Sequence, residues 1–193
     1  MANKLPMNVT PVGTAAWPWL NTPDVRYDAD GVYQVKMIFN KKDIKGIQAI
    51  VDPLMNGGKH NPVKPELDDQ DKPTGNFVVN FKLKAKAKTK SGDTFTQKPI
   101  LLDTAGNRVL NQVGAGSKLK IAYQAVPFNQ GAGGVTMRMQ KVRIMDLVEY
   151  TKKDDVDWGK DDGSFVGTAA QDSNTEDLES NTGYQISGHN EDF

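Results

Sequence analysis

The sequence of 193 residues has no cysteine, no long apolar run and no net charge. Without cysteine there is no disulfide framework, no thiolate zinc site and no cysteine nucleophile. No apolar run approaches the roughly 20 residues that a membrane helix needs. The N-terminal Met-Ala-Asn-Lys-Leu-Pro also lacks the apolar core of a signal peptide. We therefore expect a soluble, cytoplasmic protein with no membrane partner.

The zero net charge is the sum of two segments of opposite sign. Residues 154–193 contain one Lys and 11 Asp or Glu, which gives a formal charge of −10. The remaining 23 Lys or Arg and 13 Asp or Glu lie in residues 1–153 and give +10. A neutral chain argues against a polycation that binds nucleic acid, but a basic body with an acidic tail does not.

The composition also divides the chain into two parts. Residues 1–151 are numerous enough to form one domain that buries roughly 70% of its unfolded surface. From Lys152 onward, Asp, Asn, Ser, Thr and Gly dominate and apolar residues are sparse. We predict one folded domain over residues 1–151 and a disordered acidic tail over residues 152–193, which serves protein interaction.

Most of the predicted domain alternates apolar and polar residues with the period of two that is typical of half-buried strands. Such strands are predicted over residues 31–39, 77–90, 94–102, 118–128 and 135–150. In the last of these the apolar set changes phase near Gln140-Lys141, which predicts a β-bulge. Ser91-Gly92-Asp93 predicts a hairpin turn, and residues 129–134 predict a flexible glycine loop.

One short helix is predicted after Asn40-Lys-Lys-Asp43, where Ile44, Ile47 and Val51 begin a run at helical spacing. Pro53 and the pair Gly57-Gly58 are expected to end it, and residues 56–75 are expected to form an exposed loop. Several short strands and one helix favour a mainly all-β fold, a small closed or nearly closed β-barrel. An open sandwich remains the alternative.

Catalysis finds little support in the sequence. The two histidines, His60 and His189, are far apart, and a solvated position is the simpler interpretation of each. Asp68, Asp69 and Asp71 lack the glycine and the bidentate glutamate of a calcium loop. No acid–base pair, nucleophile or metal constellation is visible. We predict a protein that is not an enzyme and has no cofactor.

Lysine residues alternate with apolar residues along one predicted strand. Same-face side chains of a strand repeat at about 6.7 Å, which matches the phosphates of a stretched single strand of nucleic acid. The ladder consists of Lys82, Lys84, Lys86, Lys88 and Lys90, and further basic residues that widen it are Lys118, Lys120, Arg138, Lys141 and Arg143. The alternative interpretation is a solvated strand face whose lysines prevent aggregation.

Aromatic side chains supply the second part of a single-strand site, because every base has a face on which to stack. The candidates are Trp17, Trp19, Tyr27, Tyr33, Tyr123 and Phe128. We select Tyr33 and Phe128, and Phe128 is the stronger candidate because its strand runs into the glycine loop. Most strand aromatics are core residues, which is the alternative for each. Trp17 and Trp19 flank Pro18 in an extended segment that fits a base platform or a plug of the barrel equally well.

Three motifs carry a resemblance to a known family. They are Gly13-Thr-Ala-Ala, Gly31-Val-Tyr-Gln-Val and the block from Gly114-Ala-Gly-Ser-Lys to Val-Pro-Phe128. Together with Leu147-Val-Glu149 and the closing Asn190-Glu-Asp-Phe193, in this order, the chain resembles the single-stranded DNA-binding proteins of short-tailed bacteriophages. Two positions depart from the pattern. Asp30 stands where some relatives have a basic residue, and Gln130 stands where some have a second aromatic residue.

The resemblance implies an OB-fold with one helix, often a homodimer, that coats single-stranded DNA during phage replication, recombination and repair in the host cytoplasm. It implies that the tail contacts the replicative DNA polymerase and the helicase-primase through Glu191, Asp192 and Phe193. The acidic tail is further predicted to compete with DNA for the basic body. Two alternatives are an RNA-binding β-barrel and a non-enzymatic virion or adaptor protein.

Overall fold

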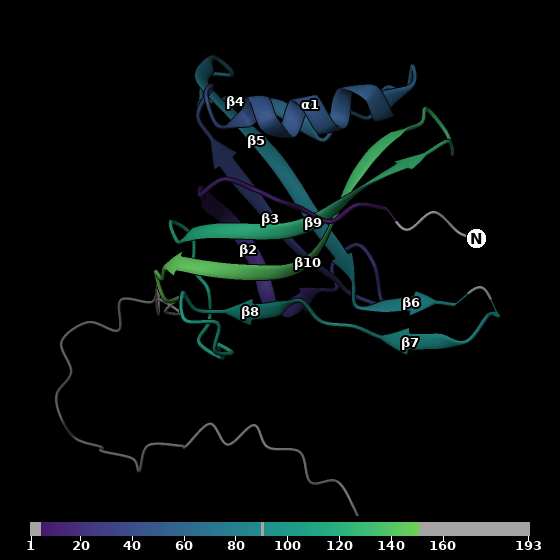
Figure 1. Ribbon diagram of the computed structural model, residues 1–193, viewed down its shortest axis with the longest axis vertical. Coiled ribbons are helices and arrows are strands. Elements are labelled where there is room, and N and C mark those ends of the chain that lie inside the picture. The colour runs from purple at the N-terminus through teal and green to yellow at the C-terminus, as the bar shows by residue number, and fades with distance from the viewer. Residues whose placement is uncertain (1–4, 90, 151–193) are drawn as a thin grey trace, which may run out of the picture. The chain divides into compact units, whose positions relative to one another are not determined.

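Ten β-strands and one α-helix form the described part of the chain, residues 5–89 and 91–150, in this computed structural model (Figure 1). In chain order they are β1 (Asn8–Val9), β2 (Gly13–Asp24), β3 (Val32–Phe39), α1 (Ile44–Met55), β4 (Val63–Leu67), β5 (Pro73–Lys84), β6 (Lys86–Lys88), β7 (Thr94–Thr96), β8 (Ile100–Leu102), β9 (Lys118–Phe128) and β10 (Gly134–Asp146). The predicted tail and Lys90 lie outside the described residues.

Five strands close into a barrel in the order β9, β2, β3, β5, β10, and β10 then pairs with β9 along its length. All neighbours in the barrel are antiparallel except β5 and β10, which are parallel. Strands β1, β4 and β8 extend the sheet beside β9, β5 and β10. This is an OB-fold-like barrel, so the predicted fold class is confirmed and the open sandwich is excluded.

The barrel interior is filled by alternate residues of the same strands that the periodicity indicated. On β3 these are Tyr33, Val35, Met37 and Phe39, and on β9 they include Leu119, Ile121 and Tyr123, all buried. Phe81 on β5 meets Tyr123 edge to face, with ring centroids 5.3 Å apart. Because side chains alternate across a strand, a buried interior leaves the intervening polar residues on the outer face.

Helix α1 lies across one end of the barrel and contacts β9 and β10 (Figure 1). Ile44, Ile47 and Val51 form its buried face. The prediction that Pro53 helps to end the helix is wrong, because the helix continues to Met55 and ends where Asn56 turns left-handed. A proline near the last turn removes one backbone hydrogen bond, and burial of the apolar face compensates for it.

The expected loop over residues 56–75 is also wrong in part, since it contains β4 and the first residues of β5. Strand β4 pairs with β5 on one side only, which makes it an edge strand. Prolines within edge strands cost no ladder hydrogen bond when the missing N–H faces away from the partner. Pro65 lies within this edge strand, and Pro73 is the first residue of β5, another position that tolerates proline. These two prolines hid the strands from a composition-based prediction.

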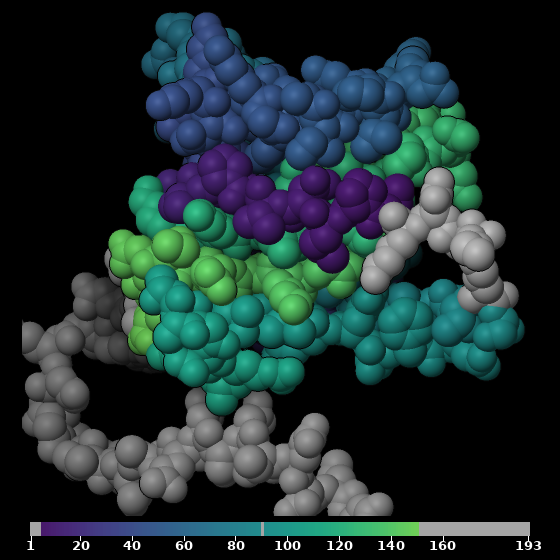
Figure 2. All heavy atoms as spheres, viewed as in Figure 1, coloured from purple at the N-terminus to yellow at the C-terminus, as the bar shows by residue number. Residues whose placement is uncertain are grey.

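The predicted bulge and hairpin are both confirmed. The β9–β10 register shifts between Met139 and Lys141, where the apolar phase changes. Strands β6 and β7 form a separate two-stranded hairpin that stands away from the barrel (Figures 1 and 2). In the described residues, no helix is long and apolar enough to cross a membrane.

Candidate nucleic-acid interface

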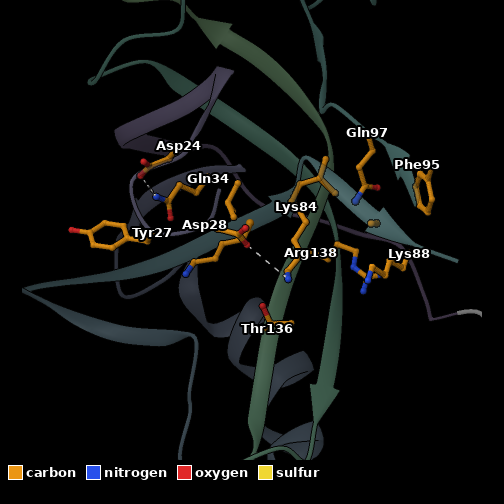
Figure 3. Close-up of a pocket in the computed structure, with 14 residues that line it drawn as sticks. Asp24, Tyr27, Asp28, Gln34, Lys84, Lys88, Phe95, Gln97, Thr136 and Arg138 are labelled. Atoms are coloured by element: carbon orange, nitrogen blue, oxygen red, sulfur yellow. Dashed lines mark hydrogen bonds and ion pairs between the residues drawn. The ribbon is translucent and has the colours of Figure 1, made fainter. Parts of the chain in front are cut away.

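Two adjoining hollows lie on the outer face of β3, β5 and β10, and together we call them the groove. The first hollow, of about 620 Å³, is shown in Figure 3 and the second has about 510 Å³. Lys82 and Thr136 line both, so the two hollows adjoin. The basic residues that line the groove are Lys36, Lys64, Lys82, Lys84, Lys88 and Arg138.

The strand register explains why basic and polar side chains meet in the floor of the groove. Lys82 on β5 lies opposite Gln34 on β3 and opposite Arg138 on β10. One step along, Lys36 lies opposite Asn80. Neighbouring strands are about 4.8 Å apart, so this row of side chains crosses the strands instead of following one of them.

The predicted lysine ladder is wrong as a single straight row, because β5 ends at Lys84. The Ala85 N–H donates to the Gly31 carbonyl, and the Ala85 carbonyl accepts from the Gln97 N–H. These bonds direct the chain out of the barrel into β6, which pairs with β7. Lys86 and Lys88 therefore lie on the hairpin, and Lys90 lies outside the described residues.

The other predicted basic residues separate into two groups. Arg138 lines the groove. Past the bulge, Lys118, Lys120, Lys141 and Arg143 lie on a different surface, which we call the β9–β10 face, and none of them lines the groove. On that face Lys120 lies directly opposite Arg143, and the Lys118 ammonium donates to the Thr14 hydroxyl at 2.7 Å.

The two predicted aromatic residues have different surroundings. Tyr33 is buried, with only 8% of its surface exposed at the edge of a third hollow beside the β6–β7 hairpin, and this burial raises the pKa of its phenol. A base has almost no access to its ring, so its placement does not support a stacking role. Phe128 is half-buried at the end of β9, with its ring centroid 5.8 Å from that of His60, which lines the second hollow.

Trp17 is the functional candidate that sequence reasoning left undecided. Its surface is 76% exposed and it lines the second hollow. The β2–β3 register shifts between Ala16 and Trp19, and Trp17 has a φ of +52°. A bulge of this kind turns a side chain out of its regular direction. The signal in the sequence was Pro18, which donates no backbone hydrogen bond and interrupts the pairing of β2.

A second aromatic group stands at the rim of the first hollow. The Arg26 guanidinium lies 5.0 Å from the Trp19 ring centroid and 5.8 Å from that of Tyr27. Asp24 holds Arg26 through bonds of 2.9 and 2.8 Å and also accepts from the Gln34 amide. The Arg26 hydrogen bonds hold the pKa of the Asp24 carboxyl well below its usual range. Tyr27, 91% exposed, lines the first hollow beside this Arg26 guanidinium.

The glycine loop borders the other end of the groove and is held by backbone hydrogen bonds. The Lys59 and His60 N–H groups donate to the Ala132 and Gly133 carbonyls, each at 3.0 Å. A Cβ at Gly134 would collide with the His60 carbonyl, so only glycine allows this approach. The loop therefore fixes His60 and Phe128 together at the edge of the second hollow.

Groups suited to metal binding are not found in the described residues. No cluster of three or more His, Asp or Glu there is arranged to hold an ion. Asp68 accepts hydrogen bonds from the Gln70 and Lys72 N–H groups, which is the geometry of a polar turn. The predicted protein-interaction residues Glu191, Asp192 and Phe193 lie outside the described residues.

Known proteins resemble this chain in sequence and in fold. No family model matches the chain. A protein of Enterobacteria phage T3 named single-stranded DNA-binding protein is 24% identical over 86% of this chain and 87% of its own length. The predicted resemblance to phage single-stranded DNA-binding proteins is confirmed.

Solved structures extend this resemblance to the fold. The crystal structure of gp2.5, a single-stranded DNA-binding protein encoded by bacteriophage T7, superposes with a TM-score of 0.61 at 22% identity, covering 86% of this chain and all of that one. The single-stranded DNA-binding protein of bacteriophage Enc34, in complex with single-stranded DNA, gives a TM-score of 0.53 at 14% identity, covering 74% of this chain and 88% of that one. The chains share a fold.

Proposed function

We propose that the chain is a non-enzymatic, sequence-independent single-stranded DNA-binding protein. The observation that carries this proposal is the groove formed by two adjoining hollows across β3, β5 and β10, with Lys82 and Arg138 in its floor and Trp17 exposed within it. OB-folds bind oligonucleotides on the face of their second and third strands, which here are β3 and β5. The names of the T3, T7 and Enc34 relatives agree.

Phosphates and bases are bound by different parts of this groove. Lys36, Lys82 and Arg138 neutralise phosphates and release counterions, with a salt slope of about −0.7 per contacted phosphate. Trp17 at one end and Tyr27 at the other offer ring faces to bases, at about 1–3 kcal/mol per stacked base. Every base can stack on an aromatic ring, and phosphates are the same at every nucleotide. Binding through these two kinds of contact therefore has no sequence preference.

The acidic tail gives the proposed protein its second activity. A flexible polypeptide of about 40 residues has a root-mean-square span of about 35 Å, which is long enough for an acidic tail of this length to compete for a basic body. At a millimolar-scale local concentration it competes with DNA. Bound DNA then frees Glu191, Asp192 and Phe193 to recruit the replicative polymerase and the helicase-primase during phage replication, recombination and repair. Homodimer formation belongs to the same proposal.

A salt-dependent titration tests the proposal. Full-length protein and a variant that ends at residue 153 are titrated with oligo-dT, with duplex DNA and with poly-U between about 50 and 300 mM salt. We expect oligo-dT to bind more tightly than duplex, and the shortened variant to bind oligo-dT more tightly than the full chain. Preference for poly-U would favour the RNA-binding alternative. No binding to any single strand at the lowest salt concentration would favour an adaptor protein.

A further inference from the structure

The ion pairs of the described residues are concentrated in one short segment. Three Lys or Arg side chains form salt bridges within residues 5–89 and 91–150, and all three use carboxylates from residues 24–30. Asp24 holds Arg26 within the same segment. Asp28 and Asp30 instead reach across to Lys84, at 3.9 Å, and to Lys86, at 3.2 Å. Figure 3 shows the Asp28–Lys84 pair inside the first hollow.

These two pairs lie where the groove passes from the barrel to the β6–β7 hairpin. Lys84 lines the first hollow, and Lys86 lines the third, more open hollow together with Asp30 and Lys98. Gln97 lines both hollows, which makes them adjacent. A strand that leaves the first hollow toward the hairpin therefore meets two lysines that already have anionic partners.

We propose that Asp28 and Asp30 act as internal phosphate mimics, which bind Lys84 and Lys86 until the phosphates of a bound single strand replace them. This inference rests on the proposed function and adds a regulation of the same site. A carboxylate offers an ammonium a negative charge and acceptor oxygens, as a phosphate does. The exchange extends the path of the strand from the groove into the third hollow.

The loop keeps its shape without the ion pairs, so the carboxylates are displaced without unfolding. The Gly31 N–H donates to the Asp28 carbonyl at 2.8 Å, and the Ala85 N–H donates to the Gly31 carbonyl at 2.8 Å. These backbone bonds join the loop to β5 independently of side-chain charge. Both lysines and Asp30 are solvent-exposed and Asp28 is half-buried, and ion pairs with this much exposure are weak enough to exchange with a competing anion.

The exchange has a thermodynamic signature. When a phosphate replaces a carboxylate on Lys84, the released carboxylate stays beside the bound strand, so the local negative charge density and the counterions that it holds change little. Two such exchanges therefore contribute almost nothing to the salt slope. Without the carboxylates, each of the two lysines contributes its full value of about 0.7 to the salt slope. The salt slope of DNA binding therefore steepens by about 1.4.

The test measures oligo-dT affinity of the full-length D28N/D30N variant between about 50 and 300 mM salt. Asparagine keeps the side-chain oxygen of Asp28 that accepts the Asp30 N–H, so the turn is retained. We expect about three- to tenfold tighter binding at the lowest salt concentration, the steeper slope above, and convergence with the unmodified protein at high salt.

The matched control is the full-length D52N/D69N variant, which makes the same change in net charge. Asp52 on α1 and Asp69 after β4 are exposed and line none of the three hollows. A third variant, K84Q/K86Q, removes the lysines. We expect D28N/D30N to have no further effect in the K84Q/K86Q background, because no lysine is left to release.

The outcomes separate this inference from the proposed function. If unmodified protein binds oligo-dT but D28N/D30N matches D52N/D69N in affinity and slope, the phosphate-mimic inference is wrong and the proposed function stands. The inference is also wrong if D28N/D30N still tightens binding after Lys84 and Lys86 are replaced. If no variant binds a single strand, the proposed function itself fails.

Discussion

The groove and the β9–β10 face are both basic surfaces of one barrel, yet they offer different things to a nucleic acid. The groove combines Lys82 and Arg138 with exposed Trp17 and Tyr27 in a hollow. On the β9–β10 face, Lys120 and Arg143 lie opposite each other on regular strands and line no part of the groove. A positive charge on a strand becomes part of a binding site when the fold places it beside a concave surface with accessible aromatic rings.

The largest predicted effect compares two cross-strand pairs of identical chemistry. Lys82 and Arg138 are paired across β5 and β10, and Lys120 and Arg143 are paired across β9 and β10. We expect K82Q/R138Q to weaken oligo-dT binding about ten- to hundredfold at about 50 mM salt and to reduce the salt slope by about 1.4. K120Q/R143Q should change affinity by less than about threefold. Equal losses would mean that charge alone determines binding.

The next effect concerns stacking at the bulge. W17A should lose about 1–3 kcal/mol of oligo-dT binding, which is the value of one stacked base, with an unchanged salt slope. W17F should recover part of the loss because it keeps a ring. Fluorescence titration at several salt concentrations measures both quantities. A change of slope in W17A would show that the replacement had disturbed the phosphate contacts.

A smaller effect concerns the support of the rim of the groove at low pH. The pKa of Asp24 is lower in the folded protein than in the unfolded chain, so its stabilising contribution is present above an unfolded pKa of about 3.9. That contribution is lost as the pH falls below this value. D24N should therefore have a lower Tm than unmodified protein at pH 7, and the difference should shrink below about pH 4. A difference that is constant with pH would exclude this linkage.

The smallest effect lies in the core beneath both surfaces. The Tyr123 hydroxyl is buried without a hydrogen-bond partner in the described residues, and burial raises its pKa to about 12. Because the unfolded pKa is about 10, stability falls as the pH rises from about 10 to 12. Y123F should be as stable as the unmodified protein or up to about 1 kcal/mol more stable, and should lack that fall. Thermal unfolding at about pH 7 and pH 11 measures both.

Prediction from sequence succeeded for features that depend only on the residues within one strand. The alternation along residues 31–39 and 118–128 located β3, β9 and their buried faces, and the phase change near Gln140 located the bulge. Prediction failed for features that depend on pairing with residues far away in the sequence. Strand β4 exists because it pairs with β5, and the lysine ladder breaks at Ala85 because Gly31 and Gln97 bind its backbone.

The candidate site follows the same division. Local pattern selects Lys82, Arg138 and Phe128, and the structure places Lys82 and Arg138 in the groove and Phe128 beside His60 at its edge. Tyr33 is also an aromatic residue on a strand, but its phase on β3 is the buried one. The local pattern does not show whether Trp17 is a base platform or a plug of the barrel, because a bulge depends on the pairing of two strands. Only the β2–β3 register reveals the bulge.

The sequence by itself determined the strand periods, the helix after Asp43, the basic body and the acidic tail, because these depend on residues that are close along the chain. Only the tertiary structure decided which basic residues share a surface. Lys82 and Arg138 are far apart in the sequence and became neighbours through the parallel pairing of β5 and β10. Lys84 and Lys86, separated by one residue, face different hollows because the chain leaves the barrel between them. Which basic residues share a surface therefore depends on how the barrel closes, and the register between strands that are distant in the sequence determines this closure.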